Sequence, residues 1–135
     1  MDTTTSNFLA LVSHASMIFC LLFQRIDNVK ASLPPTVPDF GQIYIDMDAH
    51  LSTVLSITLF AILIEVLLTF RQISPPAINI FSLICHTLAC LTLLKFIADM
   101  HPVSHFWVCF AFFNVPPLFC QIFILLSSFN KHTFL

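Results

Sequence analysis

The chain has 135 residues, of which 58% are apolar and 9% are charged, and its formal net charge is −2. In soluble domains about a quarter of the residues are charged, far more than the 9% of this chain. The mean hydropathy of the chain is +0.94. The composition therefore excludes an ordinary soluble domain and predicts a small membrane protein.

Four apolar stretches are long enough to cross a membrane as helices. A hydrocarbon core roughly 30 Å thick requires about 20 residues of helix. The stretches cover residues 8–24, 51–70, 78–98 and 106–129. The sequence thus predicts an all-α integral membrane protein with a single domain over residues 1–135, whose four transmembrane helices form an up-down-up-down antiparallel bundle.

The breaks between the stretches are polar or rich in proline. The main loop is expected at residues 25–50, which include the run PPTVP. Residues 71–77 and 99–105 are short, so we expect tight connections between antiparallel neighbours. Within the fourth stretch, Pro116 and Pro117 predict a kink, because proline lacks the backbone N–H that a helix interior uses.

Each stretch also contains one strongly polar residue at a similar depth. With a rise of about 1.5 Å per residue and alternating helix direction, these residues lie roughly 8–12 Å below the side that holds both termini. They are His14, Glu65, His86 and Gln121. A carboxylate facing lipid is costly, so we expect Glu65 to face inward and to find its partner in this set. The pattern predicts a structural polar layer that sets helix rotation and register.

Two other interpretations of this layer stay open. Two histidines and one glutamate match the ligands of a zinc or non-haem iron site, and they also suit a proton or ion path. Metal sites in helix bundles commonly use pairs such as Glu-x-x-His, which this level does not contain. We therefore expect no metal, no cofactor and no catalytic residue. The alternative is a small transporter or a proton- or metal-using membrane protein built on Glu65, His14 and His86.

Several runs of residues resemble the Transmembrane protein 107 family. They are FLALVSH and LLFQRIDNVKASLP within residues 8–34, DAHLSTVLSITL from Asp48 onward, and FWVCFAFFNVPP at residues 106–117. The spacing of His86 and Trp107 also fits the family pattern. The resemblance covers nearly the whole chain.

This resemblance implies a function that composition alone does not supply. Proteins similar to this one are non-enzymatic membrane scaffolds of the ciliary transition zone, which help assemble the Meckel syndrome module and the diffusion barrier that controls ciliary membrane composition and ciliogenesis. The implied partners are membrane lipids and transition-zone proteins, including tectonics, B9-domain proteins and other membrane components. Neither nucleic acid nor a small-molecule substrate is expected. The family's usual topology implies a multi-pass protein of the ciliary membrane with cytoplasmic termini.

Overall fold

The described part of the chain consists of helices that form four segments of membrane-spanning length. A computed structural model describes residues 2–34, 36, 41–71 and 75–132, with side chains up to residue 128 in the last helix. The helices are α1 (Thr3–Phe23), α2 (Arg25–Ala31), α3 (Gln42–Phe70), α4 (Pro76–Asp99), α5 (Val103–Phe113) and α6 (Val115–His132). The segments long and apolar enough to cross a membrane are Thr3–Phe23, Gln42–Phe70, Pro76–Asp99 and Val103–Ser128. The predicted all-α membrane fold with four spans is confirmed.

The helices extend beyond the predicted apolar stretches. α3 begins at Gln42, well before Leu51, and α2 follows α1 directly after Gln24. The expected loop at residues 25–50 is therefore helical over much of its length. Hydropathy marks only the part of a helix that is apolar, so polar helical turns next to a span escape it. Most of the PPTVP run lies outside the described residues.

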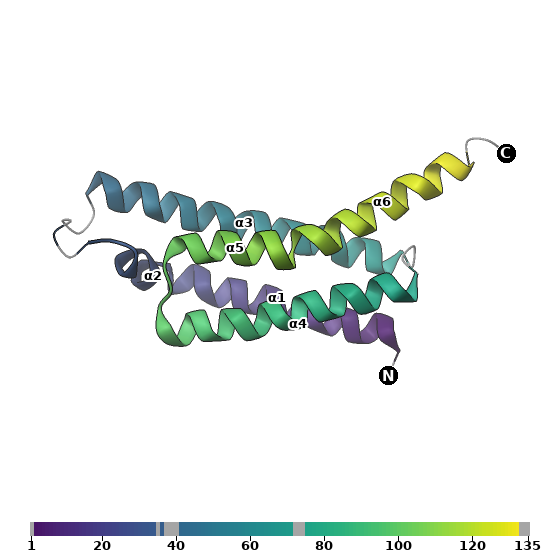
Figure 1. The fold of residues 1–135 in the computed structure, drawn as a ribbon, viewed down its shortest axis with the longest axis horizontal. Helices are drawn as coiled ribbons and strands as arrows, with labels where there is room; N and C mark the ends of the chain where they lie inside the picture. Colours follow the sequence, from purple (N-terminus) through teal and green to yellow (C-terminus); the bar gives the residue numbers. More distant parts are fainter. Residues whose placement is uncertain (1, 35, 37–40, 72–74, 133–135) are drawn as a thin grey trace.

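Successive segments run in alternate directions (Figure 1), and the contacts between them place the four segments at the corners of a square. α1 packs against α4 and α3, whereas α5 and α6 pack against both α3 and α4. Within the described part of the chain, α3 and α4 are not close-packed neighbours and lie on a diagonal. The expectation that residues 71–77 join adjacent helices is therefore wrong.

Chain geometry explains why a short connection permits this diagonal. Neighbouring helix axes in a bundle are about 8–10 Å apart, which places diagonal axes about 14 Å apart. The connector at residues 71–75 reaches about 17 Å when extended, so it can join either kind of pair. The turn between α4 and α5 does join neighbours. This turn begins at Met100, the residue after α4, whose backbone lies in the left-handed region at φ 50°.

The buried positions of the long helices are separated alternately by three and four residues. In α1 they are Asn7, Leu11, His14, Ile18 and Leu21. In α3 the same spacing selects Leu51, Leu55, Thr58, Ile62, Glu65 and Thr69. In α4 it selects Asn79, Ser82, His86, Ala89, Leu93 and Phe96. A repeat of 3.5 residues is typical of helices that pack at a small left-handed crossing angle.

The interior of the bundle is more polar in the half nearer the termini than in the other half. The hydrophobic core lies away from the termini and includes Ile18, Leu21, Leu51, Leu93 and Phe106. The half nearer the termini buries Asn, Thr, Ser, His, Glu and Gln side chains beside apolar ones such as Leu11 and Ile62. The outer surface is strongly apolar, with large aromatic side chains such as Phe60, Phe112 and Phe119 exposed. Polar groups inside and apolar groups outside suit a chain that is surrounded by lipid.

The fourth segment is divided at Asn114, just before Pro116 and Pro117. α5 ends at Phe113 and α6 begins at Val115, and Figure 1 shows that α6 continues away from the rest of the bundle. Both prolines fall in the first turn of α6, where backbone N–H groups have no partner within the helix. The interruption thus lies at the residue that precedes the proline-containing turn.

Candidate functional site: a buried polar network

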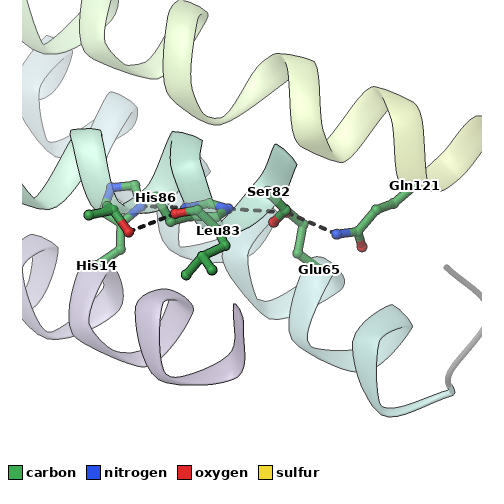
Figure 2. A network of polar contacts seen from close by, with 7 residues as sticks. His14, Glu65, Ser82, Leu83, His86 and Gln121 are labelled. Carbon is green, nitrogen blue, oxygen red and sulfur yellow. Dashed lines mark hydrogen bonds and ion pairs between the residues drawn. The ribbon is translucent and has the colours of Figure 1, made fainter. Parts of the chain in front are cut away.

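The four predicted polar residues come together, and a serine joins them. Glu65 Oε2 accepts hydrogen bonds from His86 Nε2 at 3.1 Å, Ser82 Oγ at 3.2 Å and Gln121 Nε2 at 3.3 Å. His86 Nδ1 lies 2.8 Å from His14 Nδ1. Figure 2 shows the resulting chain of contacts, which includes side chains from all four membrane-spanning segments.

The square arrangement of the helices positions these side chains. α3 and α4 face each other across the bundle axis, so Glu65 and His86 meet near its centre. Ser82 lies one helical turn before His86 and therefore shares its face of α4. Gln121 reaches Glu65 from α6, which packs beside α3. Residues distant in the sequence thus converge because each occupies an inward position of its own helix.

The network is sealed from the surroundings by the helices themselves. Four of its side chains are 0% exposed, and the fifth, Gln121, is 1% exposed. A buried carboxylate needs partners, because an uncompensated charge at membrane depth is costly. Three donors gather on Oε2 of Glu65, whereas Oε1 of the same group has no hydrogen-bond partner among the described residues.

With both imidazole rings neutral, one set of hydrogen positions fits the bonding pattern. An oxygen that accepts three hydrogen bonds fits the unprotonated oxygen of a carboxyl group, so His86 donates its Nε2–H to Glu65 Oε2. A neutral His86 then has an acceptor at Nδ1, and His14 donates its Nδ1–H to it. The remaining ring nitrogen of His14, Nε2, is consequently an acceptor.

Sequence reasoning missed several polar residues that line the same half of the bundle. Ser82 belongs to the network, and Asn7, Thr69 and Asn79 are buried nearer the termini. Their signal was the spacing of three and four residues, which places Ser82 in register with His86 and Thr69 in register with Glu65. A search for strongly polar residues alone passes over small hydroxyl side chains.

The geometry is that of a chain of hydrogen bonds and differs from that of a chelating site. Glu65 and His14 contact opposite nitrogens of the His86 ring, so the three groups do not converge on one point. Within the part of the chain that the structure describes, no three His, Cys, Asp or Glu side chains are grouped to hold a metal ion. A proton relay is geometrically compatible with such a chain, but every side chain in it is buried.

A comparison with protein families identifies the type of protein. The family model described as TMEM107, a transmembrane protein, matches residues 3–125. The chain belongs to the TMEM107 family. The TMEM107 match includes every residue of the buried network, from His14 to Gln121.

Two curated relatives carry the name Transmembrane protein 107. The protein from Danio rerio is 29% identical over 125 residues, which cover 91% of this chain and 91% of that protein. The protein from Homo sapiens is 26% identical over 127 residues, which cover 93% of this chain and 89% of that protein. No solved structure matches this TMEM107 chain significantly.

Proposed function

We propose that this TMEM107 family member is a non-enzymatic membrane scaffold of the ciliary transition zone. In this role it helps assemble the Meckel syndrome module and the diffusion barrier that controls ciliary membrane composition and ciliogenesis. The observation that carries the proposal is the family match over residues 3–125. The partners are membrane lipids, tectonics, B9-domain proteins and other transition-zone membrane proteins, and both termini are cytoplasmic.

The distribution of polar and apolar side chains supports a scaffold. His14, Glu65, His86 and Gln121 turn inward and bind one another, so at their level the outer surface is left to apolar groups. Phe60, Phe112 and Phe119 are 66%, 69% and 71% exposed and offer flat, apolar contacts within the membrane. Such a surface suits lateral contact with lipids and with the spans of other membrane proteins.

The buried network supports the same role from inside. Hydrogen bonds between membrane helices typically contribute about 0.6 kcal/mol each and at most about 2 kcal/mol, so their main effect is to select one arrangement of the helices. Glu65 is bonded to α4 and α6 at once. A fixed arrangement of helices presents a fixed outer surface to partners.

The alternative, a small transporter or a proton-using membrane protein, is favoured by one observation. His14, His86 and Glu65 form a continuous hydrogen-bonded chain, which is the arrangement that a proton relay requires. Transport additionally needs access from water, whereas these three side chains are 0% exposed. The scaffold is therefore the function that the geometry supports better.

Localisation in ciliated cells tests the proposal. The chain is tagged at its chromosomal locus, and the wild type is compared with Glu65→Gln and with Leu63→Ala, a lipid-facing control on the same helix. We expect the wild type and both variants to form a band at the cilium base. Glu65→Gln keeps an oxygen where Oε2 accepts its hydrogen bonds but cannot exchange a proton as a carboxyl group does.

Each result separates the two functions. An endoplasmic reticulum or whole-cilium pattern for the wild type contradicts the scaffold at the transition zone. Complete loss of ciliary function in Glu65→Gln with normal localisation favours proton or ion chemistry. Normal localisation together with normal ciliary membrane composition supports the scaffold.

A further inference from the structure

A small cavity lies within the bundle beside the polar network. Residues from all four segments line it, and its polar lining is supplied by His14 of α1, Thr58 of α3 and Asn114 at the break between α5 and α6. Its volume is about 10 Å³, counted as the space in which the centre of a water molecule fits. One water molecule needs about 10–15 Å³ by this measure. The cavity thus has room for a single water molecule.

Two buried atoms of the lining need a hydrogen-bond partner. Within the described residues, neither His14 Nε2 nor Asn114 Oδ1 makes a hydrogen bond, although the two side chains are 0% and 1% exposed. Leaving a buried polar atom without a partner costs about 1–3 kcal/mol. Both atoms are acceptors, because the tautomer of His14 assigned above carries its hydrogen on Nδ1. Two acceptors that share one cavity require a molecule with two donor hydrogens.

We infer that this cavity binds one ordered water molecule, which donates one hydrogen bond to His14 Nε2 and the other to Asn114 Oδ1. Thr58 does not compete for these acceptors, because its hydroxyl donates to Val54 O of its own helix at 2.7 Å. Cys109 also lines the cavity, and its thiol offers a weak donor to the water oxygen. Buried waters typically make about three hydrogen bonds, which these contacts supply.

The water turns the chain of hydrogen bonds into a ring. The chain leaves the fourth segment at Gln121, passes through Glu65, His86 and His14, and returns to the same segment at Asn114. The ring therefore contacts the interrupted fourth segment at two places, at Asn114 before its proline-containing turn and at Gln121 after it. This inference does not depend on the ciliary role.

Solid-state NMR of the full chain in lipid bilayers tests the inference. Histidine ring nitrogens are labelled with ¹⁵N, and magnetisation is transferred from water to the rings. We expect an unprotonated Nε2 on His14 with a transfer peak from a slowly exchanging water. His86 is the internal control, because both of its ring nitrogens are bonded within the network and should show no such peak.

Two variants locate the water. Asn114→Leu removes one acceptor and fills the cavity with apolar atoms, so the transfer peak at His14 should be lost. Thr58→Val is the matched control, because it alters the same lining without removing an acceptor that the water uses, so the peak should be retained.

The remaining outcomes overturn the inference. Absence of a water peak at His14 in the wild type shows that the cavity is dry, and this result does not depend on any variant folding. Retention of the peak in Asn114→Leu shows that the water is bound elsewhere. Rapid exchange with bulk water, or water peaks at both His14 and His86, shows an open path in place of a single enclosed water.

Discussion

Replacing Glu65 with leucine should destabilise the bundle through three donors at once. His86, Ser82 and Gln121 all bond to Oε2, and all three are buried away from bulk water that could replace the lost acceptor. Bonds of this kind measure about 0.6–1.7 kcal/mol each, so three of them contribute about 2–5 kcal/mol to the free energy of unfolding in a bilayer. Burial of an apolar leucine side chain is favourable in itself, but leucine leaves the three donors without an acceptor.

The measurement is the free energy of unfolding by steric trapping in bicelles. Glu65→Gln is the matched comparison, because its neutral oxygen keeps the three contacts at about half the strength of charge-assisted bonds, and it should lose about half as much stability. Leu63→Ala, on the lipid-facing side of the same helix, should change stability by less than about 0.5 kcal/mol. The reasoning is refuted by a Glu65→Leu variant that is as stable as the Leu63→Ala control.

Three further changes test other parts of the structure. Ser32→Ala removes the hydroxyl that accepts the Val103 backbone N–H at 2.9 Å at the start of α5, and the loss should be about 0.5–2 kcal/mol in the same unfolding assay. Asp48→Asn breaks the partly exposed pair with Arg25 at 3.0 Å, so thermal unfolding in bicelles should reveal a loss below about 1 kcal/mol. Replacing both residues of the Pro116–Pro117 pair with alanine restores two backbone donors, so spin labels on α5 and α6 should move further apart as the segment straightens.

Much of the polar network was predictable because lipid imposes a strict rule on strongly polar groups. Glu65, His14, His86 and Gln121 stood out as one polar residue per span at one depth, and the structure brings them together. Ser82 did not stand out, because a serine inside a span commonly satisfies its hydroxyl on its own helix, as Ser16 does with Val12 O. Its role becomes visible only when its place on the inward face of α4 is considered.

The order of the helices around the bundle was not predictable from these patterns. In water, an exposed polar face shows which side of a helix points outward, whereas in lipid both the outer face and much of the inner face are apolar. The connection between α3 and α4 is long enough to join either adjacent or diagonal helices. The depth of each residue could therefore be counted along the chain, but the neighbour of each helix could not.

The diagonal placement of α3 and α4 explains why the network uses long side chains. Adjacent membrane helices can associate through close packing of small residues, and Ala61 and Ala89 are buried on these two helices. Helices that face each other across the axis are too far apart for such contact, so the long side chain of Glu65 bridges them by reaching both His86 and Ser82 of α4. Shortening Glu65 removes both direct bonds between α3 and α4 at this level, whereas shortening His86 leaves the bond from Ser82. A long side chain at residue 65 is therefore required by the diagonal position of α3 relative to α4, and a glutamate supplies this length together with an acceptor oxygen.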